Sequence, residues 1–302
     1  MITFEKFLGL STHEVAALVK ATGPKVCGFP VNGTRRWFML EHAEKLGNDF
    51  FESYMDVSIQ NHIELCKLLF DHGIEIILAP VFGRELMRRG DEYTRRVGID
   101  GLVRTATDRH YREFFEGSRV RVRFYGDYQD VLTGTPYEYA LQSIYDVTEE
   151  TKHHTSSHLF FGVFADEVAE TVARLAVEYY LAENSIPDKQ TLIRKYYGEN
   201  LPPLSLFIGF DKFTVFDVPL LTTGEEDLYF SVSPSPYMTQ LQLRAILYDH
   251  LYVRPTPEPD YAKLSKDELN WLREYYHENR DYALGIGKLK FNIWIPDLKS
   301  EK

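Results

Sequence analysis

The sequence has few cysteines, no long apolar run and no surplus of basic residues. Its only cysteines among 302 residues, Cys27 and Cys66, lie in apolar stretches, which is typical of a reducing compartment and excludes a disulfide framework. No run of about 18 apolar residues is present, so we expect no membrane span. Acidic residues outnumber Lys and Arg by 45 to 34, a net charge of −11, which speaks against a nucleic-acid partner. The first twenty residues carry acids early and do not resemble a signal peptide. We therefore predict a cytoplasmic protein without stable membrane insertion.

Aromatic side chains, by contrast, are abundant. They make up 14% of the chain, with 20 Tyr and 20 Phe. Such a content suits a pocket for a large apolar ligand, and it suits aromatic-rich core packing equally well.

Strand-like apolar runs alternate with helical patterns along the whole chain. The predicted strands are 25–29, 75–82, 120–125, 158–164, 206–209 and 227–232. The predicted helices are 49–72, 84–117, 165–184, 237–252 and 265–279. This alternation predicts an α/β fold with a mostly parallel central sheet flanked by helices. No linker or repeat divides the chain, so we expect a single domain over 1–302, with a C-terminal helical extension from about 255 to 302.

The first strand leads into Phe29–Trp37, with the sequence FPVNGTRRW. Parallel sheets bind ligands beyond the carboxyl ends of their strands, where this loop is expected to lie. Gly33 allows close backbone approach, and the following helix presents its positive N-terminal end. Arg35 and Arg36 add guanidinium groups that suit phosphate oxygens. The loop is therefore either an anion site or a surface turn with two solvated arginines.

The second strand delivers a further basic segment to the same edge of the sheet. After Phe82 come Arg84, Arg88 and Arg89, any of which can reach the same pocket or lie on an exposed helix face.

These residues resemble motifs of the cis-prenyltransferases, the family with the undecaprenyl diphosphate synthase fold. Asn32–Trp37 is similar to the Asp-Gly-Asn-x-Arg-Trp motif, and Phe82, Glu85 and Arg89 roughly match Phe-Ser-x-Glu-Asn-Trp with its following arginine. Thr222–Glu225 lies where that family has Arg-x-Ser-Gly-Glu, but it lacks the arginine and the Arg-Leu-Ser-Asn that follows. Because those groups help to bind isopentenyl diphosphate, the resemblance argues against chain elongation.

The chain resembles more fully the diterpene synthases of this fold, the group of tuberculosinol synthase and kolavelool synthase. The shared stretches are 23–41, 69–75, 124–128, 161–164, 196–199 and 213–254. The resemblance implies a cis-prenyltransferase-like terpene synthase. It would ionise a bicyclic C20 diphosphate, kolavenyl or tuberculosinyl, and let water capture the allylic cation to give a diterpene alcohol and diphosphate. It also implies a homodimer, with the last helices as the expected contributors.

The resemblance assigns roles to individual residues. Thr34, Arg35 and Arg36 would hold the diphosphate together with the Gly33 loop, and Arg89 would assist them. Tyr54 matches a tyrosine that positions or deprotonates the attacking water. A phenol is a poor base at pH 7, so we expect Tyr54 to orient water and to pass its proton to the departing diphosphate.

Asn32 occupies a catalytic position at which the resemblance implies an Asp that binds Mg²⁺. Asn keeps the size of Asp but loses the negative charge that a hard cation prefers. Three explanations are compatible with Asn32: an introduced Asp→Asn change, a natural enzyme with weak or dispensable Mg²⁺, or a protein that binds diphosphates without turning them over. Asp217 and Glu225 are alternative Mg²⁺ ligands.

Other functions remain open at this point. The alternatives are terpenyl transfer to an acceptor such as adenosine, action on linear C15 or C20 prenyl diphosphates, and a non-catalytic prenyl-diphosphate-binding subunit. His153, His154 and His158 lie in a polar stretch without a Cys or an acid at ligand spacing, which speaks against zinc.

Overall fold

The central element of the molecule is a six-stranded parallel sheet. A computed structural model describes residues 2–23, 25–45, 49–166, 168–211 and 213–298. Its strands are β1 (Val26–Gly28), β2 (Ile76–Phe82), β3 (Val120–Tyr125), β4 (Ser157–Val163), β5 (Leu206–Phe210) and β6 (Asp227–Ser231). They lie in the order β3-β4-β2-β1-β5-β6, and every pairing is parallel. The predicted α/β fold with a parallel sheet is confirmed.

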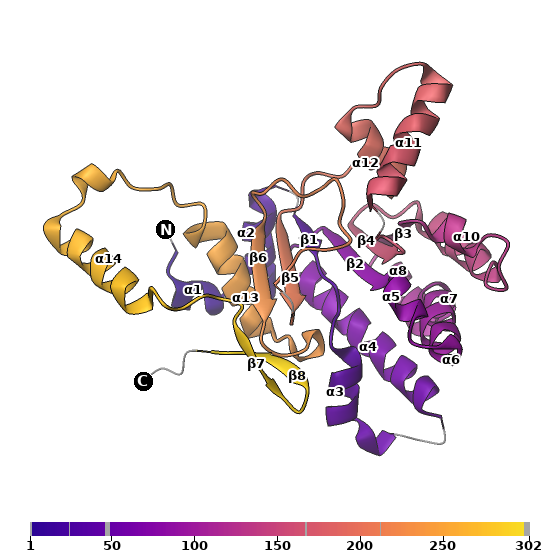
Figure 1. Ribbon diagram of the computed structural model, residues 1–302, viewed down its shortest axis with the longest axis horizontal. Coiled ribbons are helices and arrows are strands. Elements are labelled where there is room, and N and C mark those ends of the chain that lie inside the picture. Colours follow the sequence, from indigo (N-terminus) through magenta and orange to yellow (C-terminus); the bar gives the residue numbers. More distant parts are fainter. Residues whose placement is uncertain (1, 24, 46–48, 167, 212, 299–302) are drawn as a thin grey trace.

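The two faces of the sheet are covered unequally. Successive strand residues point to opposite faces, so Cys27, Ile77 and Phe161 belong to one core and Phe160 and Phe207 to the other. The helices of the larger layer are α1 (Phe4–Leu8), α2 (Thr12–Ala21), α4 (Phe50–Asp71), α7 (Asp100–Thr107), α8 (Arg109–Gly117), α10 (Tyr139–Thr151) and α13 (Gln240–Tyr248). The other face is covered by α12 (Lys189–Tyr197), by Leu201 and Leu204, and by residues between Val215 and Leu221. Figure 1 shows α4 and α8 beside the sheet.

The region 84–117 differs from the single helical stretch that the sequence predicts. It contains α5 (Arg84–Met87), α6 (Asp91–Tyr93), the π-helical turn η2 (Thr94–Ile99), α7 and α8. Gly90, with φ 99°, separates the first two helices, and Asp108 leaves the helical conformation and caps α8 through its side chain. These breaks let short helices wrap around an internal cavity.

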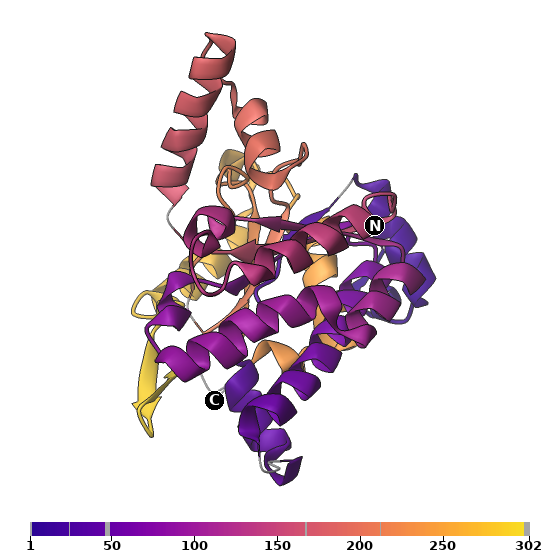
Figure 2. The same cartoon turned by 90° about the vertical axis from the view of Figure 1, so that its right-hand side faces the viewer.

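Two parts of the chain project from the body. Helix α11 (Val168–Glu183) and α12 rise together from the sheet (Figure 2), and α14 (Lys266–Asn279) stands apart from it (Figure 1). After α14, β7 (Gly287–Lys290) and β8 (Ile293–Pro296) form an antiparallel hairpin, which the expectation of a helical extension did not include. Helix α14 has no buried residue, and Trp271 is 62% exposed. The homodimer stays a prediction, and the exposed side chain of Trp271 on α14 is a candidate contact for it.

The remaining short elements close the loops around the body. They are α3 (Thr34–Glu41), α9 (Tyr128–Leu132) and the helical turns η1 (Ala43–Lys45), η3 (Ser235–Tyr237), η4 (Asp249–Val253) and η5 (Tyr261–Lys263). Across the described residues, no helix combines the length and the apolar character that crossing a membrane needs.

Candidate active site

A wide cavity of about 780 Å³, which we call the outer cavity, opens at the carboxyl ends of the strands. Its lining comes from the segments that follow four of them: 31–36 after β1, 80–83 at the end of β2, Asp166 after β4, and residues between 210 and 217 after β5. This is the edge at which parallel sheets bind ligands. The Phe29–Trp37 loop, which we call the anion loop after its expected role, therefore lies at the edge of the sheet where the sequence predicts it.

The anion loop is built around Gly33, which adopts φ 76° and serves as the N-cap of α3. A Cβ on Gly33 would lie 2.8 Å from both Phe210 and Pro234, so both the conformation and the space require glycine. The backbone N–H of Asn32 donates to Ser235 Oγ at 3.1 Å, and the backbone N–H of Ser235 donates to the backbone carbonyl of Asn32 at 3.0 Å. These bonds hold the loop so that the positive end of α3 faces the outer cavity.

Arg35, Arg36 and Arg89 all line the outer cavity. The guanidinium carbon atoms of Arg35 and Arg89 lie 5.9 and 5.7 Å from the ring centroid of Tyr93, and that of Arg36 lies 5.3 Å from Phe210. The faces of aromatic rings attract guanidinium groups in this way. The structure thus places the three predicted arginines around one space.

The other basic residues of the 82–89 segment have different surroundings. Arg84 lies 3.6 Å from Asp127 and 3.8 Å from Asp166, and neither Arg84 nor Arg88 is among the lining residues of the outer cavity. The side chain of Glu85 lies outside the described part of the chain.

Tyr54 and Thr34 form the junction to a second space. Their side-chain oxygens are 2.6 Å apart, and the Tyr54 ring stacks on Phe50 with 5.7 Å between centroids. Burial raises the pKa of Tyr54, so the phenol remains neutral around pH 7. Both hydroxyls border the outer cavity and the space behind it.

Behind this junction lies a cavity of about 190 Å³, which we call the inner cavity. It lies between the end of β2 and the helices α4, η2, α7 and α8. The apolar side chains of Ile59, Val97 and Leu102 contribute to its walls beside Tyr111. Tyr111 Oη lies 2.8 Å from His62 Nδ1, and burial lowers the pKa of His62 to about 4, so this polar pair is uncharged.

The wall of the outer cavity that follows β4 and β5 is acidic. It contains Asp166, Asp211 and Asp217. Asp211 lies 3.7 Å from Arg36. Burial and the nearby charge of Asp166 raise the pKa of Asp217 to about 6. The Tyr125 hydroxyl donates to the Asp217 carbonyl at 2.8 Å and fixes its backbone, which has φ 55°.

The residues present fit a Mg²⁺ ion poorly. Asn32 offers only a neutral amide. Of the two alternative ligands, Glu225 is exposed and outside the outer cavity, whereas Asp217 lines that cavity with a pKa that burial raises to about 6. In the described ranges, the one group of three or more His, Cys, Asp or Glu side chains close enough to share an ion lies elsewhere, at Glu116, His153 and His154. We therefore derive no chemical step through Mg²⁺.

Several lining residues were not predicted from the sequence. Tyr93, Asp166 and Phe210 border the outer cavity, and Ser235 holds the anion loop from 203 positions away. Asp166 and Phe210 lie at the ends of predicted strands, so the rule for parallel sheets offered a signal for them. Tyr93 ends the short helix α6 and Ser235 begins the turn η3, and the sequence pattern offered no signal for either of them.

Two relatives match this chain over almost its whole length. The chain is 39% identical over 299 residues to a tuberculosinyl adenosine transferase of Mycobacterium tuberculosis, covering 98% of this chain and 99% of the relative. It is 24% identical over 292 residues to a (+)-kolavelool synthase of Herpetosiphon aurantiacus, covering 95% and 94%. No protein-family model matches the chain.

Two solved structures share the fold. One is a probable undecaprenyl diphosphate synthase from Campylobacter jejuni, with a TM-score of 0.54, 16% identity, and coverage of 78% of this chain and 98% of that chain. The other is lavandulyl diphosphate synthase from Lavandula x intermedia in complex with dimethylallyl diphosphate, with a TM-score of 0.56, 15% identity, and coverage of 79% and 97%. The cis-prenyltransferase-like fold is thereby confirmed.

Proposed function

This chain belongs to the family of the tuberculosinyl adenosine transferase of Mycobacterium tuberculosis, and from that premise we propose that it transfers a diterpenyl group from its diphosphate to an acceptor such as adenosine. The relative that supports acceptor transfer is more similar to this chain than the relative that supports water capture. Transfer therefore ranks before the formation of a diterpene alcohol, which the sequence motifs alone placed first.

The first step is loss of diphosphate from the allylic carbon. The C–O bond breaks, its electron pair leaves with the diphosphate, and an allylic cation remains. Arg35, Arg36 and the amides at Gly33 and Thr34 surround the place where negative charge accumulates. Preorganised donors favour that charge separation because they need no reorganisation during the reaction.

The hydrocarbon part of the substrate enters the inner cavity. Ile59, Val97 and Leu102 supply apolar contacts there, and the His62–Tyr111 pair stays neutral, so no charge opposes entry. Tyr54, at the junction of the two cavities, lies beside the carbon that loses the diphosphate.

The single observation that carries the proposal is the acidic wall of the outer cavity, to which Asp166 and Asp217 contribute. Asp166 and Asp217 repel a diphosphate, so this wall suits a different group. An adenine or another nitrogen nucleophile becomes positively charged when its lone pair forms the new C–N bond. A carboxylate at Asp217 stabilises that charge and can accept a proton. The half-buried ring of Phe216, in the same wall, offers a face for stacking.

Water capture is the second candidate, supported by the Tyr54–Thr34 hydroxyl pair and by the kolavelool synthase relative. In this reaction water attacks the cation, and its proton passes to the released diphosphate. Tyr54 orients the water through its oxygen and does not act as a strong base, because burial raises its pKa.

The test incubates the purified protein with linear C15 and C20 diphosphates and with a bicyclic C20 diphosphate, each with and without adenosine and Mg²⁺. Products are identified by mass spectrometry, and diphosphate release is measured in parallel. A terpenyl adenosine adduct supports transfer, whereas an alcohol formed equally with and without adenosine contradicts it and supports water capture. Tight binding without diphosphate release contradicts both and leaves a non-catalytic binding subunit.

A further inference from the structure

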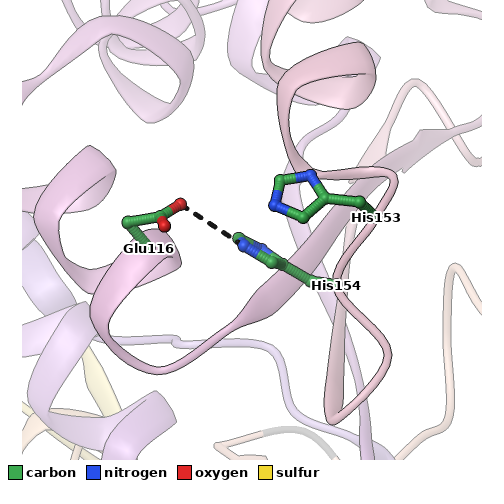
Figure 3. A group of neighbouring side chains, drawn as sticks. All are labelled: Glu116, His153 and His154. Carbon is green, nitrogen blue, oxygen red and sulfur yellow. Dashed lines mark ion pairs between the residues drawn. The ribbon is translucent and has the colours of Figure 1, made fainter.

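A group of metal-ligating side chains lies at the opposite end of the sheet from the outer cavity. Helix α8 ends at Gly117 just before β3 begins, and the loop after α10 leads into the first residue of β4. Because β3 and β4 are parallel neighbours, these two connections meet at the amino ends of the strands. The meeting point brings together Glu116, His153 and His154 (Figure 3).

His154 is fixed in an orientation that suits a ligand. It is 2% exposed, and its Nδ1 lies 2.9 Å from the carbonyl oxygen of Val120. A carbonyl oxygen can only accept, so Nδ1 carries a hydrogen and donates it. In the neutral ring, Nε2 then presents its lone pair. Metal-binding histidines are held in the same way, with the second nitrogen donating to a carbonyl or carboxylate.

The lone pair of His154 faces another acceptor. Glu116 Oε2 lies 3.3 Å from Nε2 (Figure 3), and an ionised carboxylate has no hydrogen to donate. Two acceptors at this distance repel unless a positive charge lies between them. That charge is either a proton on His154 or a bound cation.

The position of His153 favours a cation. Its ring centroid lies 4.2 Å from that of His154, and the ligand atoms of the three residues all lie within 4.8 Å of one another. A direct contact between His154 and Glu116 involves only two of these three groups. A metal ion accepts all three groups. Glu116 and His153 are exposed, so small side-chain rotations bring their atoms to ligand distances of about 2.0–2.2 Å.

We propose that Glu116, His153 and His154 form a site for a divalent transition metal, for which zinc is the expected occupant. Two imidazoles and one carboxylate suit Zn²⁺ and disfavour Mg²⁺ and Ca²⁺, which prefer oxygen ligands. The sequence argument against zinc missed Glu116, which lies 37 positions before His153. It also included His158, whose Nδ1 lies 2.6 Å from Glu199 instead.

Such a metal would join the end of α8 to the loop between α10 and β4. Helix α8 contributes Tyr111 to the inner cavity, and α7, which packs between α8 and α10, contributes Leu102. The ion would therefore stabilise the helical wall of the inner cavity from outside. Its expected effect is on stability, since it lies at the other end of the strands from the arginines.

The experiment titrates Zn²⁺ into the chelator-treated, full-length protein by calorimetry and records the visible spectrum of the Co²⁺ form. We expect one ion per chain, retained in excess Mg²⁺, and a rise in the thermal unfolding midpoint on binding. Glu116→Gln and His153→Gln change exposed side chains, so both variants should fold, and each should weaken binding at least about tenfold. His277→Gln, an exposed histidine of α14, is the matched control and should bind as the wild type does.

Two results overturn the proposal. One is the absence of stoichiometric Zn²⁺ binding, in which case Glu116 and His154 form a contact without a metal. The other is wild-type affinity in either exposed variant, which would place the ion at different residues. Neither result bears on the proposed transfer reaction, because no measurement here uses a terpenyl diphosphate.

Discussion

The inner and outer cavities meet at Tyr54 and Thr34, yet their walls differ sharply in chemistry. The inner cavity has apolar walls and a neutral His62–Tyr111 pair, whereas the outer cavity is lined by both guanidinium groups and carboxylates, which meet where Arg36 lies 3.7 Å from Asp211. This difference matches a substrate that has an apolar hydrocarbon part and a highly charged diphosphate. It also assigns separate tasks: the inner walls select the hydrocarbon, and the outer walls separate charge and receive the acceptor.

The largest effect is expected from removing two guanidinium groups that line the outer cavity, those of Arg35 and Arg36. Arg35→Ala combined with Arg36→Ala should lower the rate of diphosphate release by at least about 10²–10³-fold, the loss typical of removing preorganised donors to a developing anion. Steady-state kinetics with the preferred diphosphate measures this loss. Arg88→Ala, a change to a neighbouring arginine outside the outer cavity, serves as the control.

Activity that survives the double substitution within a few-fold would contradict the assignment of the two cavities. A soaked diphosphate analogue found away from Gly33 would contradict it equally. An equal loss with Arg88→Ala would indicate a general effect of net charge, because the chain is already acidic.

The inner cavity should be more sensitive to shape than to charge. A Cβ on Gly101 meets only the flexible end of Met55, at 3.0 Å. The side chain in Gly101→Val should therefore fill part of the inner cavity without a clash with the backbone. Displacing one or two carbons of a C20 chain should lower kcat/KM for it roughly 10–200-fold. A C10 diphosphate, whose chain is shorter, should lose much less.

The control for this change is Thr107→Val, the same side chain placed on an exposed position of α7. Comparing the C20 to C10 ratio of kcat/KM in both variants separates filling of the inner cavity from a general effect on the helix. An unchanged ratio in Gly101→Val would mean that the hydrocarbon binds elsewhere.

The sequence predicted the sheet and its binding edge because both follow from local patterns. The six apolar runs are short, bounded and β-rich, and each became a strand. Gly33 with Arg35 and Arg36 was recognisable because a turn residue precedes fixed charges at a strand end. Parallel pairing then brought Arg89 and Asp217 to the same space without further information.

What the sequence left open depends on contacts between distant segments. The bond between Asn32 and Ser235 and the approach of Glu116 to His154 join residues far apart in the chain, so no periodicity reveals them. The region 84–117 looked like one helix, since Gly90 alone is a weak stop and the capping role of Asp108 depends on where the next helix begins. Tertiary packing decides these features.

A smaller effect is expected from the acidic wall. Asp217 must be ionised to stabilise a cationic acceptor, and its pKa is raised to about 6, so transfer should rise with pH and level off above that value. Asp217→Asn should lower transfer about tenfold and remove this step from the pH profile. Asn also tolerates the left-handed backbone at this position. Glu225→Gln, an exposed acidic residue outside the outer cavity, should leave the profile unchanged.

Asp217→Asn, which should lower the rate of transfer, should raise the stability of the folded protein. Folding raises the pKa of Asp217 above its usual 3.8, so the folded state favours the protonated carboxyl. The stability that this group contributes is full below about pH 4 and is lost as the pH rises through about 6. Thermal unfolding at pH 8 should therefore find Asp217→Asn more stable than the wild type, with the difference shrinking towards pH 4. A less stable variant at pH 8 would mean that the carboxylate has a compensating partner.

The smallest effect is expected at Asn32, which lines the outer cavity next to Arg35 and Arg36 and carries a neutral amide. Asn32→Asp adds an oxygen ligand with negative charge beside the diphosphate position, so Mg²⁺ should bind more tightly and turnover should rise a few-fold at low Mg²⁺ concentration. Without Mg²⁺ the new charge repels the diphosphate, so the variant should then be slower than the wild type. If the arginines alone promote diphosphate release in the protein with Asn32, the turnover rates of this protein and of the Asn32→Asp variant should therefore cross as the Mg²⁺ concentration rises. Identical titration curves would mean that residue 32 does not contact the diphosphate, and the diphosphate would then have to bind in another part of the outer cavity.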